Sequence, residues 1–248
     1  AIANFNVASY RARYADLRSA FGNNLKAYYD HYRINGYAEG RVATGSTELQ
    51  NPTTVYNGVD YKLVYDYNYY INKYPDIKAA FNGDENATLR HFVECGMNEG
   101  RQGKASFNVA AYRANYADLR SAFGRNLKAY YMHYIGSGYR EGRKATGNGV
   151  LKNPVTVYNG VDYSLVYDYN YYISKYSDLK AAFYGDDTAA LRHFVECGMN
   201  EGRQAKDSFN VKKYKNRYND LQNAFGNDLK SYYMHYIGSG YKEGRKGN

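Results

Sequence analysis

The segment Leu191-Arg-His-Phe-Val-Glu-Cys-Gly-Met-Asn-Glu-Gly-Arg203 carries a skeleton, His-aromatic followed by Gly-x-x-Glu-Gly-Arg, that occurs five times in the 248 residues. The copies run from His31 to Arg41, His91 to Arg101, His133 to Arg143, His193 to Arg203 and His235 to Arg245. Self-similarity at a fixed spacing is the signature of a repeat protein, whose small units bury a core only with their neighbours. The chain is therefore predicted to be an array of modules.

A second signature precedes each copy: an aromatic residue, Asn or Asp, three variable residues, and then Tyr-x3-Tyr-x-Asp-(Leu/Ile)-x2-Ala-Phe. Repeats of form A begin with Phe and repeats of form B with Tyr, and an A repeat with its connector and B repeat recurs after 102 residues, from Phe5 to Phe107. The predicted boundaries are repeat A1 (1–41), a connector with a β-hairpin (42–64), repeat B1 (65–101), repeat A2 (107–143), a second connector with a β-hairpin (144–166), repeat B2 (167–203) and repeat A3 (209–245).

Helical spacing governs the first half of each repeat. In A1 the bulky residues stand at Val7, Tyr10, Tyr14, Leu17 and Phe21, which places them on one face of a helix. Asn6 is suited to cap its start, and the aromatic before it can pack onto Tyr10. Pro75 occupies the corresponding stretch of B1, where proline fits best at the first position of a new helix. A break near Tyr14 is therefore predicted in every repeat.

A second helix is predicted after Phe21, because Asn24 and its counterparts again have N-cap chemistry. Gly36 in A1 and Gly96 in B1 are predicted to end this helix as glycine C-caps. Each repeat is then a helical hairpin closed by the Glu-Gly-Arg loop. The fold class is mainly α, a tandem array of five short helical hairpins with two small β-hairpins in the connectors. The two hairpins are predicted at Asn57-Gly58 and Asn159-Gly160, because alternating residues around Asn-Gly are a strong hairpin signal.

The amino-acid composition and net charge limit the classes of partner that are expected. There are 33 Tyr, 10 Phe and no Trp, so the cores must be built from phenol and phenyl rings. The net charge of +9 favours polyanionic surroundings, but Lys and Arg are scattered among acidic residues, which argues against nucleic-acid binding. No apolar run is long enough to span a membrane. Cys95 and Cys197 hold the same position in B1 and B2 and are interpreted as buried thiols, because no Cys/His spacing suits a metal.

Charged residues around the Glu-Gly-Arg loop suggest a structural latch. In each repeat an acidic residue of the first helix is predicted to pair with the arginine of the loop, together with the loop glutamate. The residues assigned to the latch are Asp16, Glu39, Arg41, Asp118, Glu141 and Arg143. The histidines (His31, His91, His133, His193 and His235) are interpreted as packed hydrogen-bonding residues, with a ligand role as the alternative. No nucleophile elbow, phosphate loop or zinc motif is present, so no catalytic residue, metal site or cofactor is predicted.

Tyrosines that differ between A and B are the candidate ligand-binding residues. Because the two 102-residue super-repeats are very similar, comparing A with B is more informative than comparing the super-repeats with each other. Tyr28, Tyr130 and Tyr232 become Thr88 and Ala190 in B, which suggests partial exposure. Tyr37, Tyr139 and Tyr241 become Met97 and Met199. Exposed rings with a hydroxyl suit sugar rings, so these six tyrosines are the predicted glycan-binding residues; the alternative is that they fill contacts between repeats.

The motifs also resemble a known class of repeat. The run from Val157 through Asp168, the run from Tyr172 to Leu179, and the segment His193 to Arg203 are similar to tandem repeats appended to secreted enzymes and surface proteins of clostridia-like Gram-positive bacteria. The A repeats resemble a companion form. One departure is Tyr176-Ser177-Asp178, where that class often has Asn-Pro-Asp. The resemblance implies a secreted or cell-surface protein and an accessory role.

Two functions follow as hypotheses. The first is a non-catalytic module that binds cell-wall polysaccharide or another glycan and targets or anchors its parent protein. The second is a structural spacer or a docking array for another protein, with the tyrosines consumed between modules. An enzyme is the reading least supported by the residues.

Overall fold

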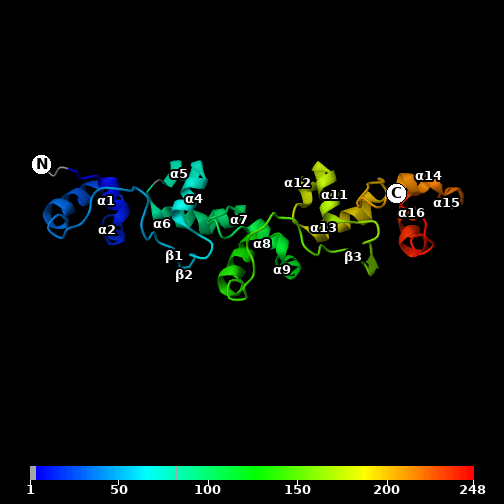
Figure 1. The fold of residues 1–248 in the computed structure, drawn as a ribbon, viewed down its shortest axis with the longest axis horizontal. Helices are drawn as coiled ribbons and strands as arrows, with labels where there is room; N and C mark the ends of the chain where they lie inside the picture. Colours follow the sequence, from blue (N-terminus) through cyan, green and yellow to red (C-terminus); the bar gives the residue numbers. More distant parts are fainter. Residues whose placement is uncertain (1–3, 82) are drawn as a thin grey trace. The chain divides into compact units, whose positions relative to one another are not determined.

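The computed structural model describes residues 4–81 and 83–248. The chain is mainly helical, a tandem array of five short helical-hairpin repeats with a two-stranded β-hairpin in each connector, as the sequence predicts (Figure 1). Contacts divide it into two compact units. The first comprises the described residues of Ala1–Val109 with Asn126–Thr146, and the second comprises Ala110–Arg125 with Gly147–Asn248.

Within the described residues, each repeat contains three seven-residue α-helices followed by a π-helical turn, and B1 also has the short helix α7. The A repeats contain α1 (Val7–Arg13), α2 (Ala15–Phe21), α3 (Leu25–His31) and η1 (Tyr32–Gly36); α8 (Val109–Asn115), α9 (Ala117–Phe123), α10 (Leu127–His133) and η3 (Tyr134–Gly138); and α14 (Val211–Arg217), α15 (Asn219–Phe225), α16 (Leu229–His235) and η5 (Tyr236–Gly240). The B repeats contain α4 (Tyr67–Lys73), α5 (Pro75–Phe81), α6 (Glu85–His91), η2 (Phe92–Gly96) and α7 (Met97–Glu99); and α11 (Tyr169–Lys175), α12 (Ser177–Phe183), α13 (Asp187–His193) and η4 (Phe194–Gly198).

The predicted helix break is confirmed. Tyr14 has an extended backbone (φ −113°, ψ 101°) between α1 and α2, and Tyr74 has the same conformation ahead of Pro75 in B1. Tyr176 repeats it in B2 without a following proline. The Tyr14 hydroxyl accepts a hydrogen bond from Val42 N at 2.7 Å, so the side chain at the break also fixes the segment after the Glu-Gly-Arg loop. Proline is therefore compatible with the break but is not its cause.

Side-chain caps start the helices as predicted. Asn6 Oδ1 accepts from Ser9 N at 3.0 Å, and Asp66, Asp168 and Asn210 make the same bond in their repeats. The second cap position is confirmed in all five repeats, by Asn24, Asp84, Asn126, Asp186 and Asp228. Removing one such cap costs about 1 kcal/mol. The short helices are thus specified locally as well as by packing.

The prediction that Gly36 and Gly96 are C-caps is wrong. Neither has a positive φ, and the chain continues through both in helical conformation as part of η1 and η2. The left-handed residues come four positions later, at Gly40 (φ 68°) and Gly100 (φ 74°). Glycine is needed at position 36 because a Cβ there would lie 2.2 Å from the Tyr10 hydroxyl oxygen. Its role is to admit a tyrosine from the first helix.

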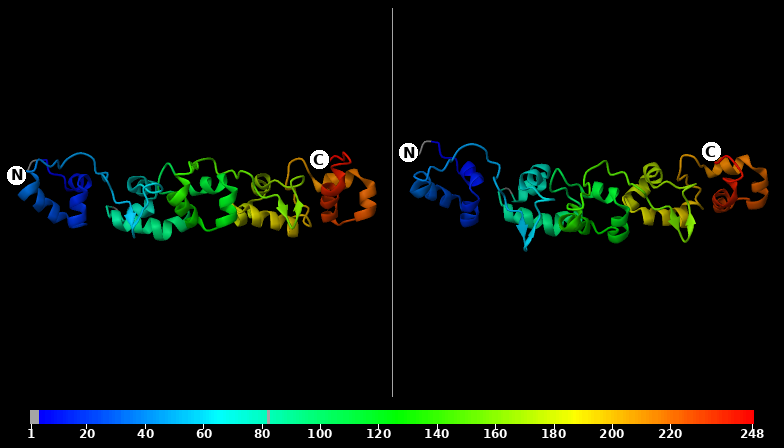
Figure 2. Two further views of the ribbon diagram at one scale, coloured as in Figure 1. Left: turned by 90° about the horizontal axis from the view of Figure 1, so that it is seen from below. Right: turned by 60° about the horizontal axis from the view of Figure 1, so that its bottom comes forward.

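Both β-hairpins form where the sequence places them. Strands β1 (Val55–Tyr56) and β2 (Val59–Asp60) pair antiparallel, as do β3 (Val157–Tyr158) and β4 (Val161–Asp162). Asn57 and Gly58 both have positive φ, the type I′ turn that matches strand twist. Figure 2 shows each hairpin beside the helices of its B repeat, where the Tyr158 hydroxyl donates to Glu196 Oε1 at 2.6 Å. The hairpins therefore belong structurally to the B repeats.

The core is built from tyrosine and phenylalanine, and one tyrosine changes helix between the two forms. In A1, Tyr28 of α3 is fully buried and its hydroxyl donates to Gly22 O at 2.8 Å, while the first helix has Val7. In B2 the first helix has Tyr169, whose hydroxyl accepts from Gly185 N at 2.6 Å, and α13 has only Ala190. The two positions exchange bulk within one core, which explains why a Tyr can become an Ala without exposing a surface.

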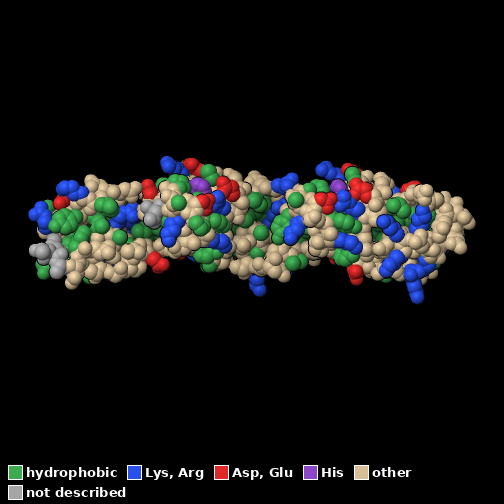
Figure 3. Space-filling model, turned by 90° about the horizontal axis from the view of Figure 1, so that it is seen from above, with side chains coloured by type: hydrophobic (Ala, Val, Ile, Leu, Met, Phe, Trp, Pro, Cys, Tyr) green, Lys and Arg blue, Asp and Glu red, His purple; other side chains and the backbone are tan. Residues whose placement is uncertain are grey.

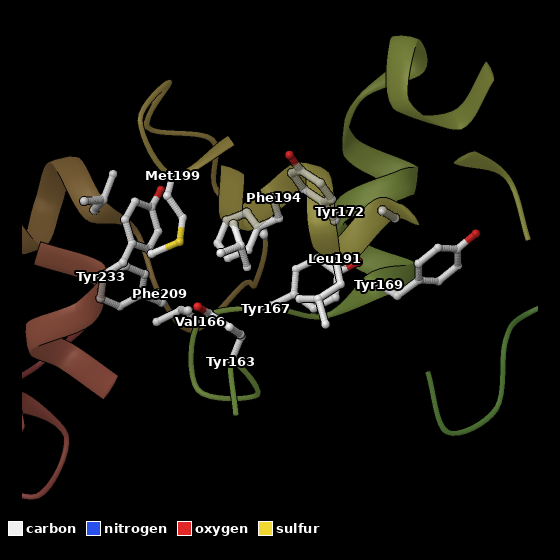
Figure 4. Close-up of a cluster of buried hydrophobic side chains, with 14 of the residues drawn as sticks. Tyr163, Val166, Tyr167, Tyr169, Tyr172, Leu191, Phe194, Met199, Phe209 and Tyr233 are labelled. Atoms are coloured by element: carbon white, nitrogen blue, oxygen red, sulfur yellow. The ribbon is translucent and has the colours of Figure 1, made fainter. Parts of the chain in front are cut away.

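Repeats are joined by two kinds of contact. From B to A, a tyrosine in the third helix of the next repeat is buried against the preceding one: the Tyr233 hydroxyl of α16 donates to Arg203 O at 2.9 Å, and its ring packs edge-on to Phe194 (Figure 4). From A to B, an arginine is buried. Arg18 Nε binds Glu85 Oε1 at 2.7 Å, and its other nitrogens donate to main-chain carbonyl oxygens at the end of α1 and in the connector.

Two equivalent buried hydroxyls have no hydrogen-bond partner among the described residues, and they lead to a prediction. Among the described residues, no hydrogen bond reaches the hydroxyl of Tyr167, or of Tyr65 at the same position of B1. Burial raises the pKa of Tyr167, so its phenol stays neutral. The A repeats have phenylalanine here. We expect Tyr167→Phe to raise the free energy of unfolding by up to about 1 kcal/mol, because it removes an unsatisfied buried group. Urea unfolding measures this.

The matched control is Tyr169→Phe, since the Tyr169 hydroxyl also donates to Phe183 O at 3.0 Å. We expect Tyr169→Phe to lower the free energy of unfolding by about 1 kcal/mol, because it removes this hydrogen bond. Equal destabilisation by the two substitutions would mean that the Tyr167 hydroxyl is satisfied in solution.

Candidate functional site

The Glu-Gly-Arg loop is tied to the first half of its own repeat by its arginine. In A1, Arg41 Nη1 binds Asp16 Oδ2 at 2.9 Å and Arg41 Nε binds Glu39 Oε2 at 2.6 Å. The guanidinium also lies over the Tyr14 ring, 4.8 Å from its centroid, a cation–π contact. The loop is thus pinned to the residue at the helix break.

The same arrangement recurs in other repeats. Arg101 binds Asp76 at 2.7 Å and Glu99 at 2.5 Å, and Arg245 binds Asp220 at 2.8 Å and Glu243 at 2.6 Å. In A2 the structure places Glu141 Oε2 2.6 Å from Arg143 Nε, and Asp118 in the first turn of α9.

These ion pairs lie at the surface. The carboxylates of Asp16 and Glu39 are exposed, and the Arg41 side chain is partly buried against Tyr14. In B1 the hydrogen bond from Arg101 holds the pKa of the Asp76 carboxyl below its usual value, so that pair is charged at neutral pH. The acidic partners of Arg41 are therefore not buried, and the latch of A1 is a surface network. Exposed pairs contribute little.

The expected exposure of Tyr28, Tyr130 and Tyr232 is wrong. All three are fully buried, because each fills the space that the first-helix tyrosine fills in B repeats. The Tyr232 hydroxyl donates to Gly226 O at 2.9 Å and its ring packs edge-on to Phe225, so both its polar and its apolar parts are used inside the repeat. These three tyrosines belong to the core.

Tyr37, Tyr139 and Tyr241 are exposed at 71%, 57% and 56% of their surface. Each follows the π-helical turn, and its ring meets the edge of a core tyrosine; the Tyr241 and Tyr236 centroids lie 5.9 Å apart. In B2 the same position is Met199, fully buried beside Tyr233 and Phe209 of the following repeat (Figure 4). In B repeats this position is a methionine buried between two repeats, whereas in A repeats it is a tyrosine on an open surface.

Other tyrosines that look equivalent in sequence differ in exposure. Tyr29 is 47% exposed, whereas its counterparts Tyr131 and Tyr233 are buried against a B repeat. Tyr184 is exposed in B2, where B1 has asparagine. Among the described residues, the A-repeat tyrosines after the π-turn are the exposed rings that recur in every A repeat.

The histidines bind tyrosines within their repeats. His31 Nδ1 is 2.9 Å from the Tyr10 hydroxyl oxygen, and His91, His193 and His235 pair with the equivalent tyrosine. His133 Nε2 lies 3.3 Å from the Ser137 hydroxyl. In the part of the chain that the structure describes, no cluster of three His, Cys, Asp or Glu is placed to hold a metal ion.

The interpretation of Cys95 and Cys197 as buried thiols is wrong. Both are free and exposed. The π-helical turn directs Phe92, Val93 and Gly96 inward, which leaves Glu94 and Cys95 facing solvent.

Sequence reasoning missed the buried arginines. Arg18 and Arg120 look like ordinary residues on a helix face, but each is buried against an acidic residue of the next repeat, Glu85 and Asp187. The available signal was the substitution pattern: both A repeats followed by a B repeat have arginine, and A3 has Gln222.

On the face shown in Figure 3, Lys and Arg side chains are interspersed with Asp and Glu. Within the described residues, no helix is both long and apolar enough to cross a membrane. Comparison with family models, with curated proteins and with solved structures gave no match.

Proposed function

We propose that this chain is a non-catalytic repeat module that binds cell-wall polysaccharide or another glycan polymer. In this role it targets or anchors its parent protein, which we place among secreted or cell-surface proteins of Gram-positive bacteria on the resemblance of its motifs. The observation that carries the proposal is that every A repeat has one exposed tyrosine at the same position: Tyr37, Tyr139 and Tyr241. In B repeats this position is a buried methionine.

The chemistry of the site supports this ligand class. A tyrosine ring offers a flat apolar face and a hydroxyl at one end, which match the C–H face and the hydroxyl groups of a sugar ring. The Tyr37 ring lies edge-on to Tyr32, with the ring centroids 6.2 Å apart, and most of its surface is open to a ligand. A single ring of this kind binds weakly.

Repetition compensates for weak single sites. When several sites on one chain engage one polymer, binding at the later sites is intramolecular, and avidity can exceed the single-site affinity by roughly 10² or more. This favours an extended, repetitive ligand such as a polysaccharide over a small soluble sugar.

The test is retention of the purified chain on insoluble cell walls and on a panel of insoluble polysaccharides. We expect Tyr37→Ala, Tyr139→Ala and Tyr241→Ala to weaken retention singly by a few-fold and together by about 10²-fold, because avidity is lost. The matched controls are Tyr29→Ala and Tyr184→Ala, which remove tyrosines whose exposure does not recur in the other repeats. Equal retention of the triple variant and the parent would contradict the proposal.

The alternative function is a structural spacer or a docking array for another protein. The contacts between repeats favour it: most tyrosines are consumed in cores and between repeats, and the buried Arg18 and Tyr233 contacts join successive repeats. If the parent chain binds no polysaccharide at low salt, the spacer or docking function is favoured.

A further inference from the structure

A cleft of about 580 Å³ lies between α1 of repeat A1 and α4 of repeat B1, within the first compact unit. Connector residues line another side of it. Asn68 fixes the connector there, because its Oδ1 accepts from Leu49 N at 3.2 Å and its Nδ2 donates to Leu49 O at 2.8 Å. The volume is within the range of ligand-binding clefts, about 300–1,000 Å³.

Three polar side chains at the cleft are not used by the protein. Glu48, Asn72 and Lys78 are exposed along its lining, and no hydrogen bond or ion pair to another described residue engages their side chains. Together they offer a carboxylate, an amide and an ammonium group, that is, acceptors and donors. By contrast, Arg11 is committed to the wall, where it donates to Gly22 O and Gly83 O.

The apolar part of the lining includes Leu25, which is 53% exposed. Its counterparts in A2 and A3 are covered by the preceding B repeat: a Cβ on Gly100 would lie 3.0 Å from Leu127 Cδ1. Ile71 of α4 also lines the cleft, but its side chain is almost fully buried. The cleft therefore combines an apolar patch with unengaged hydrogen-bonding groups.

We propose that this cleft is a binding subsite for an N-acetylated sugar of the glycan. The assignment rests on the proposed function and names its ligand class. In this assignment the acetamido methyl packs on Leu25, the N–H donates to the Glu48 carboxylate and the carbonyl oxygen accepts from Lys78, while Asn72 binds ring hydroxyls. A sugar without the acetamido group leaves the apolar patch uncovered.

A second depression adjoins the cleft. It has a volume of about 520 Å³, shares Glu48, Asn68 and Asn72 with the cleft and adds Tyr69 and Lys73. An oligosaccharide seated in the cleft can therefore extend past Tyr69.

The second super-repeat supplies a natural comparison. Val150 and Ser174 stand at the positions of Glu48 and Asn72, while Lys180 matches Lys78. The proposed subsite therefore belongs to the first super-repeat. It also follows that Glu48→Val with Asn72→Ser is compatible with the fold, because the same helices and connector form with those residues in the second.

The experiment is titration calorimetry of the full chain with a soluble tetramer of N-acetylglucosamine, and with a glucose tetramer as the ligand control. We expect one N-acetylated tetramer per chain, weaker binding of the glucose tetramer, and a loss of about tenfold or more in affinity in the Glu48→Val/Asn72→Ser variant, because hydrogen bonds to the ligand are removed. The Tyr37/Tyr139/Tyr241 triple alanine variant should bind the soluble tetramer like the parent.

Unchanged binding in the double variant would overturn the proposal, as would no binding of the N-acetylated tetramer by the parent. Equal affinity for the glucose tetramer would overturn the assignment of the ligand class. Each of these results is separate from the proposed function, because tyrosine-dependent retention on insoluble polysaccharide is measured independently. Loss of that retention in the triple variant with no tetramer binding by the parent would leave glycan binding standing without this subsite.

Discussion

Replacing Arg120 by alanine is expected to lower the free energy of unfolding by about 3–5 kcal/mol, because it removes one partner of a buried ion pair. The Arg120 and Asp187 side chains are 3% and 4% exposed, with Nε and Oδ2 3.2 Å apart. The other guanidinium nitrogens donate to Arg113 O and Ala114 O, both at 3.1 Å, and to Lys152 O at 2.8 Å. The substitution therefore leaves the buried Asp187 carboxylate without its cationic partner, with Val155 N at 3.0 Å as its remaining donor, and it removes one donor from each carbonyl.

Urea unfolding followed by circular dichroism measures the effect, with Arg203→Ala as the matched control. Arg203 also binds two carboxylates, but those carboxylates are exposed, so its loss should shift the midpoint several-fold less. Because neighbouring repeats stabilise one another, the Arg120→Ala transition should also broaden or split. Similar midpoints for the two variants would show that burial does not set the strength of the Arg120 pair.

Local patterns in the sequence predicted much of the fold. The Asn and Asp caps, the break at Tyr14 and the two Asn-Gly hairpins depend on residues close in sequence, and the structure has all of them. The helical repeat architecture followed from the recurring skeleton. These features need no knowledge of what lies across the core.

Features that depend on distant residues were misread. Tyr28 becomes Thr88 in B, and a tolerated loss of bulk suggested exposure; the compensating change from Val7 to Tyr67 lies on another helix, 21 residues earlier in each repeat. Gly36 looked like a C-cap because the residue that requires it, Tyr10, contacts it only in the folded repeat.

Of the six tyrosines that the sequence suggested as ligand-binding residues, three are exposed and three are buried. Tyr37, Tyr139 and Tyr241 were identified as differing from B, but only the structure separates them from the buried three. Arg18 and the cleft beside Glu48 were not found, because both depend on how the connector returns past α1 and α4. The sequence shows which residues are present, but not which of them lie side by side in the folded chain.

Gly240, in the π-helical turn of A3, packs closely against the Tyr214 side chain, and its substitution is expected to have the second large effect on stability. We expect Gly240→Ala to destabilise repeat A3 by about 3 kcal/mol, the upper part of the range for overpacking a core. A Cβ at this position would lie 2.2 Å from the Tyr214 hydroxyl oxygen and 3.0 Å from His235 Nδ1. Those two atoms are themselves bonded at 2.9 Å, so neither moves without breaking the pair. Thermal and urea unfolding report the loss.

The same turn provides the control. Gly238 lies two residues earlier, and a Cβ there meets nothing within 4 Å, so Gly238→Ala should be neutral or slightly stabilising because alanine favours helical backbone. The decisive variant is Gly240→Ala combined with Tyr214→Phe, which removes the oxygen nearest the new methyl group. If the clash is the cause, the double variant recovers part of the lost stability, and the two substitutions are non-additive. Additive losses would instead assign the cost to the backbone of the π-turn, and the tyrosine would not be the reason that glycine occupies this position.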